Sequence, residues 1–349
     1  MPEQKMPDLG PLNPFFKDDA VTEIMVNDTR NVFLEKAGKL VFSGMKIQNA
    51  EDLALIVRNL TESGGRPLSH DRPYSDLVLP DGSRVNVVGP PLTVSGPAVT
   101  IRRFPKKRPS AEDLMANATF DQRLAYFLNV CVVGKRNILI SGGTGSGKTT
   151  LLNLFCQFVP RSERIVTIED TPEIYIQHDN SVRLVTRPKD GTTPAIESRD
   201  LLANALRMRP DRIVLGECRR GEALDMLQAM NTGHEGSMTT LHSNTPREAL
   251  YRLETLVMMS GVELPFTAIR KYIATSIDLI VQIKRFRSGA RKITHVSEVT
   301  GMEGETILLQ DIFELKTEDE GVAHALGFVP TFLSELQEMG IQISNDYFA

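Results

Sequence analysis

The chain has 349 residues and a hydrophobic share of 41%, which is enough material for two folded domains with separate cores. The formal net charge of −4 gives no general argument for a nucleic-acid partner, although basic residues cluster locally at 102–108. No apolar run approaches the roughly 20 residues that span a bilayer, and the N-terminus lacks the pattern of a signal peptide, so we expect a cytoplasmic protein.

The first part of the chain predicts a mixed α/β domain. Residues 1–14 are rich in proline and polar residues and are expected to form a loose lead-in. Within residues 15–104 we expect a helix at 49–63 and strands at 21–27, 32–34, 40–42, 84–88 and 98–104. Residues 105–116, which are basic and flanked by prolines, are interpreted as a linker between domains.

Strands and helices alternate in the second part, residues 117–349. The pattern predicts helices at 121–133, 149 onward, 198–208 and 223–230, with strands at 138–140, 164–169, 183–184, 212–217 and 237–241 between them. Such alternation implies right-handed crossovers and a parallel sheet whose ligands bind at the carboxyl ends of the strands. Two helices (246–259, 265–276), later strands (278–284, 292–299, 306–314) and a closing helix near 331–339 complete the domain. The fold class is α/β.

A glycine-dense loop lies between the apolar run at 138–140 and the next helix. Gly142, Gly147, Lys148 and Thr149 fill the fixed positions of the phosphate-binding (Walker A) motif, with the strand and helix that the motif needs on either side. Lysine can reach the β- and γ-phosphates, and the threonine hydroxyl can ligate Mg²⁺. The expected nucleotide-binding residues are Gly142, Gly143, Thr144, Gly145, Ser146, Gly147, Lys148, Thr149 and Thr150.

Acidic residues end two of the expected strands. Glu217 follows a short apolar run, where a carboxylate can hold or polarise the attacking water of a hydrolysis reaction. Asp211 precedes that strand and is expected instead to cap it or to pair with Arg209 or Arg212. Glu169 and Asp170 end a neighbouring strand and are placed to approach Mg²⁺ or its water shell, with a plain helix cap as the alternative.

Histidines and arginines supply further candidates. His234 and His242 frame one strand near the same expected sheet edge, where they either sense the γ-phosphate or have a structural role. An arginine from another domain or a neighbouring subunit often completes a triphosphate site. The candidates are Arg84, Arg102 and Arg103 on expected strands of the first domain and Arg219 after Glu217, and a solvated surface charge is the alternative for each.

In combination these motifs resemble a known family. The loop at 142–150 and the acidic box Ile168-Glu-Asp170 are followed in order by segments 206–217 and 230–242. This arrangement is similar to the bacterial secretion and type IV pilus motor ATPases, and most closely to the tight-adherence (Tad) pilus branch, CpaF/TadA. The sequence departs from the pattern at Cys218-Arg219-Arg220, where an apolar residue, Arg and Gly are expected, and at Ser243, where Ala is usual.

The resemblance implies a RecA-like P-loop NTPase domain at the C-terminus, ATP and Mg²⁺ as ligands, and a hexameric ring with ATP between the two domains. It further implies that Thr149 and Glu169 serve the metal, that Glu217 activates water, and that Arg84 and Arg102 reach the phosphates. The ring would attach peripherally to an inner-membrane platform protein and act indirectly on pilin.

The leading hypothesis is therefore a motor ATPase for type IV-like pilus assembly, with retraction as the other direction of action and no nucleic acid as partner. A P-loop nucleic-acid translocase, supported only by the basic cluster at 102–108, and a type IV secretion ATPase are the alternatives. A nucleotide-gated scaffold without turnover is a further alternative, against which the presence of Lys148, Thr149 and Glu217 argues.

Overall fold

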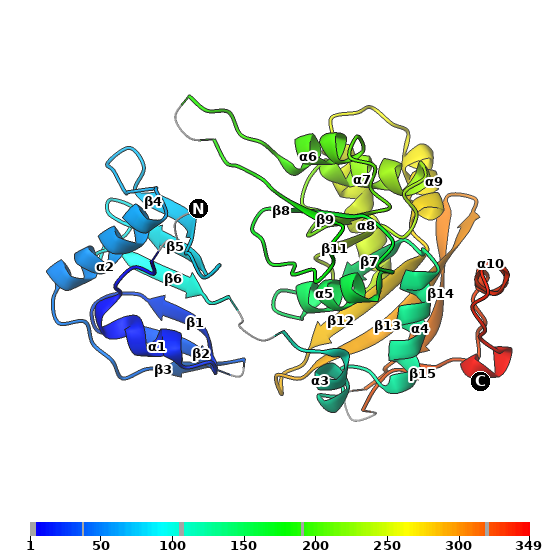
Figure 1. The fold of residues 1–349 in the computed structure, drawn as a ribbon, viewed down its shortest axis with the longest axis horizontal. Coiled ribbons are helices and arrows are strands. Elements are labelled where there is room, and N and C mark those ends of the chain that lie inside the picture. Colours follow the sequence, from blue (N-terminus) through cyan, green and yellow to red (C-terminus); the bar gives the residue numbers. More distant parts are fainter. Residues whose placement is uncertain (1–4, 37, 105–107, 190–191, 318–320) are drawn as a thin grey trace. The chain divides into compact units, whose positions relative to one another are not determined.

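The structure of the protein is a computed structural model that describes residues 5–36, 38–104, 108–189, 192–317 and 321–349 (Figure 1). The chain divides into two units, Met1–Arg108 and Pro109–Ala349, which are described separately. The expected linker at 105–116 overlaps this division. Residues 105–107, including two lysines of the basic cluster, lie outside the described residues, and α3 (Ala111–Ala116) belongs to the second unit.

The first unit is built on a six-stranded antiparallel sheet in the order β3-β2-β1-β6-β5-β4. Its strands are β1 (Val21–Val26), β2 (Val32–Lys36), β3 (Lys39–Phe42), β4 (Tyr74–Val78), β5 (Arg84–Val88) and β6 (Ala98–Arg102). The helix α2 (Ala50–Ser63) begins after Asn49, whose side chain accepts the Asp52 N–H, and it buries Leu53, Ile56 and Leu60 in the core of the sheet. The expected mixed α/β architecture is confirmed.

Residues 1–14 were expected to form a loose lead-in, but the structure corrects this for the second half of the segment. Leu9 and Leu12 are 1% and 0% exposed, and they join the core of the first unit. A 3-10 turn (Gly10–Leu12) and the short helix α1 (Asn13–Lys17) hold them there. The sequence did not predict this role, because two leucines are too few to form a periodic pattern in a proline-rich segment.

The second unit contains a nine-stranded sheet in the order β15-β14-β13-β12-β7-β11-β10-β8-β9. Its strands are β7 (Ile138–Ser141), β8 (Ile165–Glu169), β9 (Ser181–Val185), β10 (Arg212–Leu215), β11 (Met238–Leu241), β12 (Leu279–Arg285), β13 (Arg291–Glu303), β14 (Thr306–Glu314) and β15 (His324–Ala325). Neighbouring strands from β12 through β7 to β9 are parallel, as expected. From β12 to β15 the pairing is antiparallel, because hairpins join these later strands.

Helices cover both faces of this sheet and give it two cores. One core contains apolar residues of α4 (Gln122–Val133) and α5 (Lys148–Phe158) together with Ile138 and Ile140 of β7. The other contains Leu139 and residues of α6 (Ser198–Ala205), α7 (Glu222–Asn231), α8 (Pro246–Met258) and α9 (Phe266–Ser276). Consecutive residues of β7 therefore point to opposite cores, as strand geometry requires. The chain closes with α10 (Leu333–Glu338) and a 3-10 turn at Asn345–Phe348.

Asn137 fixes the start of β7 against both neighbouring strands. Its side-chain oxygen accepts the N–H groups of Gly236 (2.8 Å) and Ser237 (3.1 Å), which precede β11. Its own N–H donates to the Asp278 carboxylate (2.6 Å), and its carbonyl accepts from Asp278 and Leu279 at the start of β12. One buried residue thus aligns three parallel strands, through its side chain toward β11 and through its backbone toward β12.

Replacement of Asn137 by Ala is predicted to lower the free energy of unfolding by about 2–4 kcal/mol, because the buried N–H groups of Gly236 and Ser237 would lose their acceptor. Urea denaturation measures this change. The control is Asn231→Ala, which removes an exposed amide that donates to the Thr275 hydroxyl and should cost less than about 1 kcal/mol. Equal losses in the two variants would contradict the anchoring role.

Candidate functional site

The glycine loop joins the end of β7 at Ser141 to the start of α5 at Lys148. Gly142 and Gly147 show why this loop needs glycine. A Cβ on Gly142 would lie 2.4 Å from the Ile283 carbonyl oxygen of β12, and Gly147 has a φ of 106° at the N-cap of α5. Gly142 is therefore required by the close approach of β12, and Gly147 by its left-handed backbone conformation. The loop ends at the N-terminus of a helix, where amide groups attract anions.

Lys148 lies over the inside of this loop. Its ammonium donates to the carbonyls of Gly142 (2.9 Å) and Gly143 (3.0 Å) and contacts Nδ1 of His242 at 3.1 Å. Burial lowers the pKa of Lys148 to about 8, and the nearby Glu217 carboxylate opposes this shift. The lysine is thus held by groups that a phosphate oxygen could replace.

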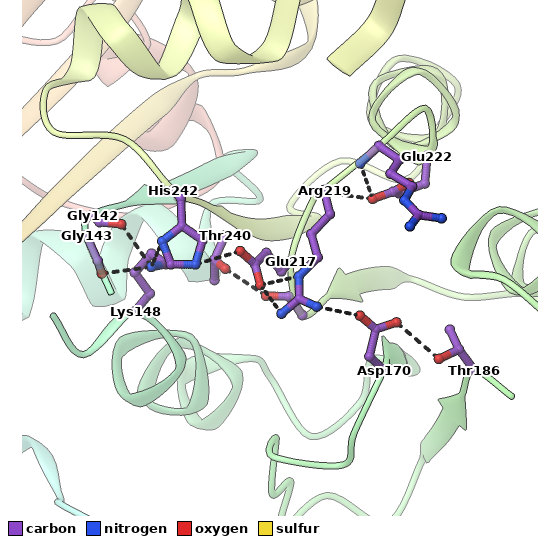
Figure 2. Close-up of polar contacts among 12 residues, drawn as sticks. Gly142, Gly143, Lys148, Asp170, Thr186, Glu217, Arg219, Glu222, Thr240 and His242 are labelled. Atoms are coloured by element: carbon purple, nitrogen blue, oxygen red, sulfur yellow. Dashed lines mark hydrogen bonds and ion pairs between the residues drawn. The ribbon is translucent and has the colours of Figure 1, made fainter. Parts of the chain in front are cut away.

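Glu217 follows β10 and is bonded on both sides, as Figure 2 shows. Its Oε1 lies 2.8 Å from Nε2 of His242, and its Oε2 accepts from Nε of Arg219 at 2.7 Å. Another guanidinium nitrogen of Arg219 lies 3.1 Å from Asp170, which in turn accepts the Thr186 hydroxyl. These contacts connect the carboxyl ends of four strands: β11, β10, β8 and β9.

The surroundings of His242 favour the neutral imidazole. Burial and the charge of Lys148 lower the pKa of the imidazole, although Glu217 acts in the opposite direction. Because Nδ1 faces the three donors of the ammonium, it accepts there, and the proton lies on Nε2, which donates to Glu217. The ring therefore links the phosphate loop to the strand-end acid by two hydrogen bonds.

Glu169 organises the segment after β8. Its Oε1 accepts the N–H groups of Glu173 (2.8 Å) and Ile174 (2.7 Å), and burial raises its pKa to about 7 against these two hydrogen bonds. Its Oε2 is buried, accepts no hydrogen bond from the described part of the chain, and lies 4.0 Å from a guanidinium nitrogen of Arg183. One oxygen thus shapes the loop while the other stays available to a cation.

The structure brings together Lys148, His242, Glu217, Arg219 and Asp170, as the sequence predicted for one sheet edge. Thr149 and Thr150 lie in the first turn of α5, half-buried, and Thr144 and Gly145 are exposed in the loop. The buried Ser146 hydroxyl has no hydrogen-bond partner among the described residues.

The structure corrects the expected position of His234. It precedes β11, whereas His242 follows this strand, so the two histidines lie at opposite edges of the sheet. The Ser237 hydroxyl donates to the His234 carbonyl, at the same edge as the Asn137 anchor. Two residues on either side of one strand lie at its opposite ends, so of these two histidines His242 is the one at the carboxyl end.

Asp211 has a structural role, as expected. Its carboxylate accepts the Arg164 N–H at 2.6 Å, and it pairs with neither Arg209 nor Arg212 among the described contacts. The fully buried Arg212 side chain instead bonds Glu163 and the Gly236 carbonyl. The structural interpretation of Asp211 holds, but with a different partner.

Glu222 is a site residue that the sequence analysis did not select. Its Oε1 accepts the N–H groups of Arg219 (2.6 Å) and Arg220 (2.9 Å), which fixes the segment that carries Arg219 next to Glu217. The available signal was an acid in the first turn of the helix that follows the strand-end acid. Cys156 and Cys218 are buried in the two cores, which raises their pKa to about 12.

The arginines of the first unit have distinct environments. Arg84 of β5 and Arg102 of β6 are directly opposite each other in the sheet, and Arg102 also pairs with Glu23 at 3.1 Å. The Arg103 side chain is 7% exposed and donates to the carbonyls of Phe16, Asp18 and Val21. Arg103 therefore holds the first unit together, whereas Arg84 and Arg102 remain candidates for a phosphate.

The glycine loop, the strand-end acid and the largely parallel sheet of the second unit, preceded by a mixed α/β unit, define the class of proteins with an N-terminal α/β domain and a RecA-like C-terminal domain. Residues 5–310 match the model of the type II/IV secretion system protein family. The chain belongs to this family.

Similar proteins support both the fold and the family. A Methanocaldococcus jannaschii protein is 42% identical over 238 residues, which are 66% of this chain and 33% of that longer relative. The type IV secretion system protein VirB11 of Brucella suis biovar 1 is 32% identical over 321 residues, with 83% of this chain and 88% of VirB11 covered. The ATPase DotB of Legionella pneumophila shares the fold, with a TM-score of 0.57 and 19% identity over 86% of this chain and 84% of DotB.

In the described parts of the chain, the helices are all too short or too polar to cross a membrane.

Gly142→Ala is predicted to lower the free energy of unfolding by about 1–3 kcal/mol, because its new methyl group would collide with the Ile283 carbonyl. Chemical denaturation of the protein without added nucleotide checks this. Gly143→Ala is the matched control, since a Cβ there would meet no atom within 4 Å and should cost less than about 1 kcal/mol. A control as unstable as the Gly142 variant would show that loop flexibility, and not the approach of β12, requires the glycine.

Proposed function

We propose that this chain hydrolyses ATP at the loop of residues 142–150 and uses the energy to assemble a Tad or other type IV-like pilus. The observation that carries the proposal is the continuous contact from Lys148 through His242 to Glu217 across the glycine loop. It joins a phosphate-binding cation to a carboxylate that can act on water.

Phosphate binding would proceed by exchange at Lys148. The ammonium now donates to two loop carbonyls, and β- and γ-phosphate oxygens are stronger acceptors because they carry charge. The lowered pKa of about 8 still leaves the lysine mostly protonated at neutral pH, and an added phosphate would raise it. The amide groups of the loop and the N-terminus of α5 would receive the same anion.

The residues present fit Mg²⁺. The Glu169 Oε2 is a buried acceptor to which no described residue donates a hydrogen bond, and Thr149 lies in the first turn of α5. Across the described ranges, no group of three or more His, Cys, Asp or Glu side chains could hold a metal ion alone. Thr149, Glu169 and Asp170 would therefore hold the ion together with the phosphates, as magnesium commonly requires. When bound, it neutralises and orients the phosphate oxygens.

Glu217 would orient the attacking water and accept its proton. For this the carboxylate must exchange a present partner, and the neutral His242 is the weaker one. His242 would then report the γ-phosphate, since it contacts both Lys148 and Glu217. Arg219 would stabilise the charge that develops at the phosphate, and Arg84 and Arg102 of the first unit would reach the phosphates as well.

Two variants test the chemistry. Lys148→Ala should weaken ATP binding by about 100-fold or more, because the loop loses its cation. Glu217→Gln should bind ATP within a few-fold of the parent and turn over about 100-fold more slowly. Calorimetry and phosphate release measure both effects. The surface variants Lys271→Ala and Glu263→Gln serve as controls, and undiminished hydrolysis by Glu217→Gln would move the catalytic role elsewhere.

We further propose a hexameric ring with ATP between the domains, attached from the cytoplasm to an inner-membrane platform protein that transmits its motion to pilin. A type IV secretion ATPase is the second candidate, because VirB11, a type IV secretion system protein, is 32% identical over 83% of this chain. Both candidates need the same ATPase chemistry.

A nucleic-acid translocase predicts a different response. Turnover by the full chain should change by less than about twofold when single-stranded DNA is added, because the formal net charge is −4 and translocases bind strands through basic grooves. The measurement is ATP turnover at low salt with increasing DNA. Stimulation of tenfold or more would favour the translocase over the motor.

A further inference from the structure

Three polar residues form a row across the carboxyl ends of β12, β7 and β11. Ser141 ends β7, and its neighbours in the sheet are Gln282 of β12 on one side and Leu241 of β11 on the other. Ser243 follows Leu241 by two residues, and its hydroxyl is hydrogen-bonded to the Ser141 hydroxyl. The Gln282 amide donates to the Ser243 carbonyl at 3.4 Å. Ser141 is fully buried, so this row belongs to the interior of the second unit.

The acceptors fix the direction of these hydrogen bonds. The Ser243 hydroxyl lies 2.9 Å from the Thr245 carbonyl oxygen, which can only accept. The single proton of Ser243 is therefore donated to Thr245, and the proton between the two serines comes from Ser141. Loss of the Ser243 hydroxyl would leave the buried Ser141 donor without the acceptor that it has in the described part of the chain.

Ser243 extends the pairing of β11 past its end. The Gly142 N–H donates to the carbonyl of Leu241, the last residue of β11, and His242 comes next. Through Ser243, the residue after that, the chain is tied to both β7 and β12. The position of His242 is therefore held from both sides, by the strand before it and by the serine after it.

His242 and Ser243 are neighbours that face opposite sides of the sheet. Ser141 lies on the same face of β7 as Leu139, which belongs to the core with α6, α7, α8 and α9. The ring of His242 contacts Lys148 at the start of α5, a helix of the other core, as Figure 2 shows. An anchor for Ser243 on one face thus keeps the imidazole on the other, beside the glycine loop.

We propose that Ser243 is a positioning residue for the proposed reaction, which accepts the Ser141 hydroxyl and thereby holds His242 between Lys148 and Glu217. Its effect on turnover rests on the proposed function, whereas its effect on the place of the imidazole does not. Ser243 is also a position where the sequence departs from the family pattern, and the Ala that is usual there could not accept this hydrogen bond.

The first test is the titration of His242 in Ser243→Ala, made in the full chain. The charged groups that face the imidazole are those of Lys148, Glu217, Arg219 and Arg252. Burial and the Lys148 charge lower the pKa of His242 in the parent, so an imidazole that leaves this place should have a higher pKa, closer to the ordinary value. NMR titration of labelled histidines without nucleotide measures the shift, with the signal assigned by its loss in His242→Gln.

Turnover is the second measurement on Ser243→Ala. Phosphate release should slow by about tenfold, because a small misplacement of a group beside the reacting atoms is costly. ATP affinity by calorimetry should stay within about twofold, since Lys148 keeps its bonds to the loop. The matched control is Ser276→Ala, which removes a buried hydroxyl that donates to the carbonyls of Leu227 and Tyr272 and should change neither measurement.

Ser141→Ala removes the same hydrogen bond from its other end and leaves Ser243 its bond to Thr245. Because both single changes delete one shared interaction, the double variant should shift the pKa of His242 and slow turnover no more than the more affected single variant.

Three results would overturn the inference. They are an unchanged pKa of His242 in Ser243→Ala, an equal shift in Ser276→Ala, and additive effects in the double variant. A lower melting temperature with the parent's His242 titration would likewise leave Ser243 with a role in stability alone. A parent protein that does not hydrolyse ATP would overturn the proposed function, while the titration of His242 would still test how the imidazole is held.

Discussion

The alignment of β7 with β11 and β12 is the constraint on which the site depends. Asn137 ties the three strands together at their amino ends, in the interior, where an unpaired amide would be costly. Because parallel strands rise equally per residue, alignment at one end fixes the other end too. At that end, β7 leads into the glycine loop, β11 into His242, and β12 into its hairpin with β13. Asn137, at the amino ends of the strands, thus helps to fix the geometry at their carboxyl ends.

The polar groups of that edge satisfy one another. Lys148 bonds carbonyls and His242, and Glu217 shares its oxygens between His242 and Arg219. The site therefore keeps its shape through its own hydrogen bonds, and any anion must compete with them. Affinity then reflects the difference between two sets of polar contacts, which favours a ligand with charged oxygens over a neutral one.

Much of this could be predicted from sequence because the signals are local. The glycine loop, the apolar runs and the acids that end them lie close together in the chain, so spacing alone placed Lys148 and Glu217 at one edge. His234 was misplaced because proximity to a strand does not say which end of it. The hydrogen bond between Ser141 and Ser243 could not be predicted, since it depends on a register between strands that hydrophobic periodicity does not encode.

Arg219 is shared between Glu217 and Asp170, and Asp170 also holds the hydroxyl of Thr186, the residue after β9. Arg219 cannot change its hold on one carboxylate without altering the other. The ends of β11 and β9 are three strand spacings apart, roughly 14 Å at about 4.8 Å each. The contacts of Arg219 and Asp170 therefore connect Glu217 to the last strand of the sheet, at the point where the segment after Thr186 begins. A change in the contacts of Glu217 can thus alter those of a strand that carries none of the proposed phosphate-binding residues.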